Sequence, residues 1–181
     1  MTPEELKVLQ KSQRISTWAS KKLYYNIGKS LQRSWTVKRG EVYFVDLGEN
    51  IGSEENRLRP VVVLQANSYN FRSPVFTCAI ISNSPLTLPD IQIPIRDSYS
   101  YLDQSGVAKT LTGAIDLGQI KTIAKERIVS KKVCILVSEM TDVDVKLLNV
   151  FGVKSMLDKR DNTIKSLVGK IDYLMKSKEE S

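Results

Sequence analysis

Hydrophobic residues recur along this chain with helical spacing at both ends and with strand-like spacing in the middle. Residues 1–35 place apolar side chains on an imperfect stripe of helical period, with basic side chains on the other faces. The segment from Thr2 to Glu5 is a strong helix start, because it offers a capping hydroxyl, a proline at the first helical position and two acidic side chains. The pattern predicts a basic amphipathic helix, which Gly28 interrupts near its end.

From residue 38 onward the apolar positions follow strand patterns. Runs rich in β-branched and aromatic residues predict strands at 41–47, 60–65 and 75–81, and a further strand is predicted around 111–117. The run 90–96 alternates strictly, and the proline within it indicates a strand at a sheet edge. Polar loops that contain glycine or proline separate these runs. Short consecutive strands without intervening helices favour an antiparallel sheet or a small barrel.

Helical spacing returns at the end of the chain. Thr141 and Asp144 form a start that resembles a capping box, and the apolar residues after them predict a mostly buried helix. A polar break at 158–162 precedes a second amphipathic helix, whose apolar stripe has to be buried somewhere. The predicted organisation is a basic helical extension at 1–35, a compact domain at 36–157 and an additional amphipathic helix at 158–181.

Composition and charge narrow the class of protein. The chain has 181 residues, of which 41% are hydrophobic and 26% charged, as in a soluble globular protein. No apolar run approaches the roughly 20 residues that span a bilayer, and the N-terminus lacks the pattern of a secretory signal. We therefore expect a cytoplasmic protein without a membrane partner.

The basic charge gathers in the N-terminal extension. The net charge is +7, and residues 1–35 carry seven Lys/Arg against two Asp/Glu. Clustered basic charge is compatible with an anionic partner such as RNA, and equally with a merely solvated surface. The predicted helix is suited to RNA or to an anionic membrane surface, but packing against its own domain or a second subunit is favoured.

The residue inventory restricts the available chemistry. The chain contains no histidine, which removes the usual general acid and base and the commonest zinc ligand. Its two cysteines, Cys78 and Cys134, lie in apolar predicted strands without metal-binding or redox spacing, so both are predicted to be buried thiols. We predict neither a metal site nor a cofactor, and any catalysis has to use other groups.

Four sequence pieces point to a family. They are VKRGEVYFVDL at 37–47, GSEENRLRPVVVLQ at 52–65, FRSPVFTCAIIS at 71–82 and QIKTI at 119–123. In this order and at these separations they resemble the MazF/PemK family of toxin ribonucleases, over about residues 37–157. The resemblance implies an α+β, mainly β fold: an SH3-like antiparallel barrel or twisted sheet with C-terminal helices, here with an N-terminal helical extension.

The resemblance also implies an activity and partners. It implies a metal-independent endoribonuclease toxin that cleaves single-stranded RNA through attack of the 2′-hydroxyl, leaving a 2′,3′-cyclic phosphate and a 5′-hydroxyl. It implies a homodimer whose groove is blocked by a cognate antitoxin protein. The basic extension and the last helix depart from the compact family pattern, as does Gly118, where relatives often have glutamate.

Five residues are the candidates for the site. Arg59 matches the family's Arg-Pro, and its planar, permanently charged guanidinium suits a phosphorane, as stabiliser and as candidate proton donor. Ser82 stands where the family usually has threonine and keeps the hydroxyl. Glu54 is our candidate general base, a suggestion that goes beyond the resemblance. Ser53 and Gln119 are predicted to contact RNA.

Two other classes of function stay open at this point. One is a non-catalytic toxin, a protein-binding or RNA-binding module on the same fold in the manner of the gyrase inhibitor CcdB. The other is a basic RNA-binding domain without activity. Fold does not decide among them, because function belongs to the site. Arg59 with Ser82 beside the Gly52 loop is the feature that a pure protein-binding inhibitor would not need.

Overall fold

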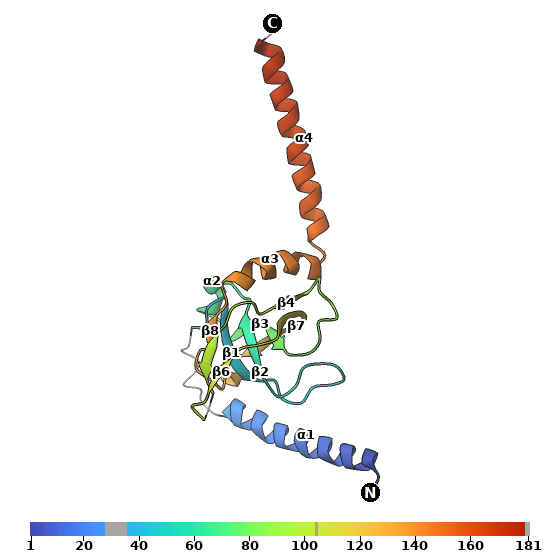
Figure 1. Cartoon of the computed structure of the whole chain (residues 1–181), viewed down its shortest axis with the longest axis vertical. Coiled ribbons are helices and arrows are strands. Elements are labelled where there is room, and N and C mark those ends of the chain that lie inside the picture. Colours follow the sequence, from blue (N-terminus) through green and yellow to red (C-terminus); the bar gives the residue numbers. More distant parts are fainter. Residues whose placement is uncertain (28–35, 104, 180–181) are drawn as a thin grey trace.

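The computed structural model describes residues 1–27, 36–103 and 105–179, and its centre is a six-stranded antiparallel sheet between two long helices (Figure 1). The elements, in chain order, are α1 (Pro3–Ile27), β1 (Glu41–Asp46), β2 (Leu58–Val63), α2 (Asn67–Asn70), β3 (Val75–Ser82), β4 (Gln92–Pro94), β5 (Ser100–Leu102), β6 (Ala108–Thr110), β7 (Ala114–Ala124), the 3-10 turn η2 (Lys125–Arg127), β8 (Cys134–Ile135), α3 (Ser138–Val150) and α4 (Lys154–Glu179).

The strand order β4-β7-β3-β2-β1-β8 makes an open sheet in the described part of the chain, with each neighbouring pair antiparallel. The predicted fold class, a mainly β antiparallel fold with an N-terminal helix and C-terminal helices, is confirmed. Pro94 lies in the edge strand β4, as predicted, where a missing N–H breaks no ladder. The hairpin β5–β6 falls in a segment predicted as a loop, and β7 runs well past the predicted end at residue 117.

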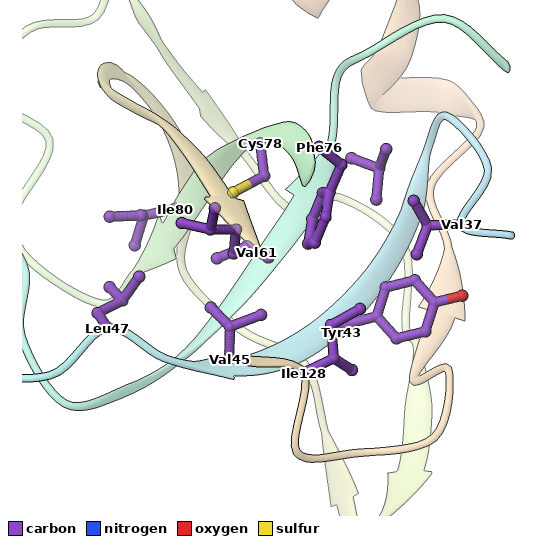
Figure 2. Close-up of a cluster of buried hydrophobic side chains, with 11 residues drawn as sticks. Val37, Tyr43, Val45, Leu47, Val61, Phe76, Cys78, Ile80 and Ile128 are labelled. Carbon is purple, nitrogen blue, oxygen red and sulfur yellow. The ribbon is translucent and has the colours of Figure 1, made fainter. Parts of the chain in front are cut away.

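Both faces of the sheet are buried, which explains its continuous apolar runs. Figure 2 shows one face, where Tyr43 and Val45 of β1 pack against Phe76 and Cys78 of β3. Alternate residues of the same strands fill a second cluster, which α3 covers with Val143 and its neighbours. Strands buried on both faces need no polar alternation, so VVV at 61–63 and CAII at 78–81 are apolar throughout.

The N-terminal helix begins as predicted and lies against its own domain. The backbone N–H of Glu5 donates to Thr2 Oγ1 at 3.2 Å, and that of Thr2 donates to Glu5 Oε2 at 2.7 Å, which makes a capping box. Lys21 Nζ lies 3.3 Å from Asp46 Oδ2 at the end of β1. The favoured packing on the protein itself is thus confirmed for α1, whereas Gly28 and the end of the predicted stripe fall outside the described residues.

Two predictions for the end of the chain are wrong. α3 begins at Ser138, three residues before the expected start, and it buries only Glu139 and Val143 instead of most of its length. The predicted polar break at 158–162 is helical, because the chain turns earlier, at Gly152 with a φ of 66°. α4 projects away from the sheet (Figure 1), and its apolar stripe is exposed.

The remaining expectations concern cysteines and membranes. Cys78 is fully buried, as predicted, but Cys134 is only partly buried, because β8 is a two-residue edge strand. Burial raises the pKa of the Cys78 thiol to about 12, although the nearby charges of Arg127 and Lys121 lower it.

Among the described residues, none of the helices is both long and apolar enough to cross a membrane.

Candidate active site

The loop between β1 and β2 carries two of the five candidate residues, Ser53 and Glu54, and is closed at its neck. The N–H of Leu47 donates to the carbonyl oxygen of Arg57 at 2.7 Å, and the N–H of Arg57 donates to that of Gly48 at 2.7 Å. Arg57 has a φ of 63°, a left-handed conformation that is uncommon for residues other than glycine. These two hydrogen bonds hold the backbone at the neck of the loop in place. Ser53, Glu54 and Glu55 therefore lie on a loop whose two ends are fixed.

The carboxylate of Glu55, which was not among the candidates, joins two of the three predicted catalytic side chains, Arg59 and Ser82. Arg59 Nε donates to Glu55 Oε2 at 2.8 Å, and Ser82 Oγ donates to Glu55 Oε1 at 2.7 Å. The side chain of Glu55 is 16% exposed and that of Arg59 is 43% exposed. Of the three guanidinium nitrogens of Arg59, Nε alone makes a hydrogen bond within the described part of the chain. The two Nη groups remain available to a ligand.

Strand register explains why Arg59 and Ser82 meet. β2 and β3 are antiparallel, with Val61 opposite Ile80. Arg59 lies two residues before Val61, and Ser82 lies two residues after Ile80, so both side chains point to the same face at the same rim of the sheet. β2 begins at Leu58, two residues before the predicted strand at 60–65, so Arg59 is its second residue and pairs with Val45 of β1. Ser82 is the last residue of β3, as expected.

The predicted base lies apart from this cluster. Glu54 Oε2 is 2.7 Å from Lys121 Nζ, on β7, and the Glu54 side chain is 54% exposed. Neighbouring carboxylates of the loop therefore have different partners: Glu54 pairs with a lysine, and Glu55 with an arginine and a serine. The role of Glu54 as a base stays a hypothesis.

Gln119 holds the loop against the sheet. Its Nε2 donates to the carbonyl oxygen of Ser53 at 3.1 Å, and its Oε1 accepts from the N–H of Glu55 at 3.4 Å. Gln119 lies in β7 next to the irregularity where the β3–β7 register shifts between Ala79 and Ile80. Its amide is thus occupied by the loop backbone, while the Ser53 side chain is exposed. The predicted RNA contacts of both residues stay predictions.

One signal in the sequence was available for Glu55. It stands four residues before Arg59, the spacing at which acidic and basic side chains pair on helices, but here the two lie on a loop and a strand. The approach of Ser82 depends on strand pairing and has no local signature. Among the described residues, no group of three or more His, Cys, Asp or Glu side chains is placed to hold a metal ion.

Comparisons with known proteins define the class of this chain. Residues 38–151 match the family described as PemK-like, MazF-like toxin of type II toxin-antitoxin system. The chain is 30% identical over 137 residues to endoribonuclease EndoA of Bacillus subtilis (strain 168), covering 76% of this chain and 98% of that protein. It is 33% identical over 110 residues to endoribonuclease MazF of Staphylococcus epidermidis, covering 60% and 85%. The chain belongs to the PemK/MazF family and is an endoribonuclease toxin.

Solved structures with a similar chain path include members of the same family. MazF of Deinococcus radiodurans is 14% identical with a TM-score of 0.49, over 65% of this chain and 98% of that one. A mycobacterial endoribonuclease in complex with its cognate antitoxin is 18% identical with a TM-score of 0.49, over 64% and 95%.

Proposed function

We propose that this endoribonuclease cleaves single-stranded RNA without a metal ion. In this reaction the 2′-hydroxyl attacks the adjacent phosphorus, and the products are a 2′,3′-cyclic phosphate and a 5′-hydroxyl. The observation that carries the proposal is the placement of Arg59 and Ser82 at one rim of the sheet, joined by one carboxylate. A guanidinium with free Nη groups and a neighbouring hydroxyl are the donors that an anionic phosphorane needs.

The division of roles follows from the chemistry of each group. Arg59 is the fixed cation that meets the charge developing on phosphorus, because it stays charged at every working pH and its Nη groups have no hydrogen-bond partner among the described residues. Ser82 supplies one neutral hydrogen bond to a phosphate oxygen. Ser53 on the loop and Gln119 on β7, which holds that loop, contact the RNA on either side of the scissile phosphate.

The partners follow from family membership. We propose that the chain acts in the cytoplasm as a homodimer and that a cognate antitoxin blocks its RNA groove. A mycobacterial relative has been solved in complex with its cognate antitoxin, which supports this kind of partner. The basic α1 adds affinity for the phosphate backbone and takes no part in the chemistry.

An assay of RNA ends tests the proposal. Purified protein is incubated with a long single-stranded RNA in excess EDTA, and the new ends are characterised by their reactivity with polynucleotide kinase and by mass. We expect 5′-hydroxyl and 2′,3′-cyclic phosphate ends from the unaltered protein and almost none from Arg59→Ala. Binding without cleavage by the folded, unaltered protein would contradict the proposal and favour a non-catalytic binding module.

A further inference from the structure

We propose that Glu55 is the general base of the cleavage reaction, the group that removes the proton from the attacking 2′-hydroxyl. This inference rests on the proposed function and names a catalytic residue for that same site. It starts from the contacts of the Glu55 carboxylate: Arg59 Nε at 2.8 Å on one oxygen and Ser82 Oγ at 2.7 Å on the other. Both groups donate hydrogen bonds, so the Glu55 carboxylate acts as an acceptor here. A general base also has to be an acceptor, because it takes up a proton.

The geometry of the reaction requires the base and the stabilising cation to be neighbours. The attacking oxygen lies about 3 to 3.5 Å from phosphorus in a near-attack arrangement, and the base lies within about 3.2 Å of the oxygen that loses its proton. When the Nη groups of Arg59 hold a phosphate, the adjacent 2′-hydroxyl therefore lies beside any carboxylate that is hydrogen-bonded to the same guanidinium. Glu55 meets that condition directly.

Glu54 meets the requirement of lying beside Arg59 less well. Its carboxylate is 2.7 Å from Lys121 Nζ on β7 and is more than half exposed. Nothing in the described part of the chain links that carboxylate to Arg59 or Ser82, whereas the Glu55 side chain is only 16% exposed and contacts both. Of the two adjacent carboxylates, Glu55 is the one held beside the predicted phosphate position.

The backbone of Glu55 is fixed on both sides. Its N–H donates to Gln119 Oε1 at 3.4 Å, and its carbonyl oxygen accepts from Asn50 Nδ2 at 2.7 Å. A catalytic side chain gains most when its own support is rigid, because the reacting geometry is then present before substrate arrives. The neck of the loop at Leu47 and Arg57 provides a second level of support.

The step balances without a metal or a redox partner. Glu55 accepts the proton of the 2′-hydroxyl while the 2′-oxygen forms a bond to phosphorus. The bond between phosphorus and the 5′-oxygen breaks, and that oxygen takes a proton from water. The proton on Glu55 then passes to the hydroxide that remains. Arg59 stays charged throughout. Ser82 has a single O–H donor, so its hydrogen bond to Glu55 breaks when it donates to a phosphate oxygen, and that carboxylate oxygen is then open to the proton.

Glu55→Gln tests the proposal, because it removes the base while keeping the size of the side chain. Single-turnover cleavage in EDTA is measured as a function of pH at saturating RNA. For the unaltered protein we expect the rate to rise with pH and then level off. For Glu55→Gln we expect a loss of about 100- to 10,000-fold, the usual contribution of a general base, and no rising limb. Binding of an RNA with a 2′-deoxy cleavage site should be unchanged or tighter, because a negative charge leaves the phosphate position.

Three further variants make the result decisive. Glu4→Gln makes the same chemical change on an exposed residue of α1 and should leave rate and pH profile unaltered. Glu54→Gln tests the competing carboxylate. If Glu55→Gln does not fold, Glu55→Asp, which keeps a carboxylate one methylene shorter, should retain the rising limb at a lower plateau.

Several outcomes would overturn the role of Glu55. Cleavage by Glu55→Gln at or above the unaltered rate would mean that the carboxylate only occupies the phosphate position in the free protein. Loss of the rising limb in Glu54→Gln, and not in Glu55→Gln, would assign the base to Glu54. A folded Glu55→Asp protein without that limb would also contradict the proposal. Absence of cyclic phosphate ends with the unaltered protein would instead remove the proposed function itself, which separates the two failures.

Discussion

The indole of Trp18 lies on the backbone of Gly48, so closely that a β-carbon built on Gly48 would fall 2.1 Å from Trp18 Cε2. The guanidinium of Arg127 covers the same indole ring at 5.2 Å from its centroid. The carbonyl oxygen of Gly48 also accepts one of the two hydrogen bonds that close the neck of the loop carrying Glu55. The N-terminal helix is therefore docked at the neck of the loop between β1 and β2, through an aromatic contact that needs a residue without a side chain.

Gly48→Ala is expected to release α1 from the domain. An alanine there meets a left-handed φ of 73° and the Trp18 ring together. Gly52→Ala is the matched control, since Gly52 has a φ of 58° but nothing within 4 Å of the added carbon. Each change should cost about 1 to 2 kcal/mol for the left-handed backbone, and only Gly48→Ala should also displace Trp18. Hydrogen exchange should show faster exchange of the α1 amides in Gly48→Ala alone. Equal protection of α1 in both variants would contradict this account of the contact.

Removing residues 1–35 should lower RNA affinity and leave the cleavage sites unchanged. The extension has an excess of five positive charges, which act on phosphates with little regard for sequence. Three of these basic side chains, Lys11, Arg14 and Lys21, already face Glu49 or Asp46, so the loss should be modest and should fade with added salt. The measurement is a map of cleavage sites with binding curves at two salt concentrations. A folded, truncated protein that cuts at different sequences would make α1 part of the recognition surface.

The sequence was sufficient for elements with strong local patterns. The start of α1, the first three strands and the edge position of Pro94 follow from capping residues, β-branched runs and the missing proline N–H. The start of α3 could not be predicted in this way, because Val137, in the N-cap position, makes no side-chain capping bond. The helix is instead fixed by Glu139, whose buried carboxylate accepts hydrogen bonds from a distant segment.

The candidate site was predicted in part. The motif pattern identified Arg59 and Ser82, and the structure places them together. The motif pattern did not identify Glu55, because its contact with Ser82 depends on the pairing of β2 with β3. That pairing brings Ser82 close from 27 residues away along the chain. In the sequence, Glu54 and Glu55 are adjacent glutamates of one polar loop, and nothing local tells them apart. Their partners in the folded protein distinguish them: Glu55 contacts Arg59 and Ser82, and Glu54 pairs with Lys121 on β7.

Glu139→Gln should destabilise the fold in a pH-dependent way. Burial raises the pKa of the Glu139 carboxyl, but hydrogen bonds from the N–H of Arg96 and from the hydroxyls of Ser138 and Tyr99 outweigh burial, so the pKa lies below its ordinary value. A lowered pKa in the folded state contributes stability above the unfolded pKa, and that contribution is lost as pH falls through the folded pKa. We expect a loss of about 1.5 to 3 kcal/mol at neutral pH, the value of hydrogen bonds to a charged group.

Urea denaturation at neutral and at acidic pH measures this effect. The difference in unfolding free energy between the unaltered protein and Glu139→Gln should shrink in acid, where the wild-type carboxyl also becomes neutral. Glu4→Gln, on the exposed start of α1, is the control and should show no such trend. A difference that stays constant with pH would mean that Glu139 contributes packing alone.

The assembly is expected to be a two-fold dimer. Family membership is the basis for this expectation, and the exposed apolar side chains of α3, among them Val145 and Phe151 just beyond its end, leave surface for a partner. Light scattering at micromolar concentration should give twice the mass of one chain, 20.4 kDa. A monodisperse monomer under those conditions would contradict the dimer.

The rate of RNA cleavage by Arg59 variants tests the central claim most directly. Loss of a preorganised charge-stabilising donor commonly lowers turnover about 100- to 1,000-fold, or about 3 to 4 kcal/mol. Arg59→Ala should therefore fold and bind a short RNA but barely cut it in a single-turnover reaction with EDTA. Arg59→Lys should recover only part of the loss, because an ammonium lacks the planar fork, and Ser82→Ala should lose less, since a hydroxyl contributes one neutral hydrogen bond. Near-normal cleavage by a folded Arg59→Ala protein would remove Arg59 from the mechanism and contradict the account of the site.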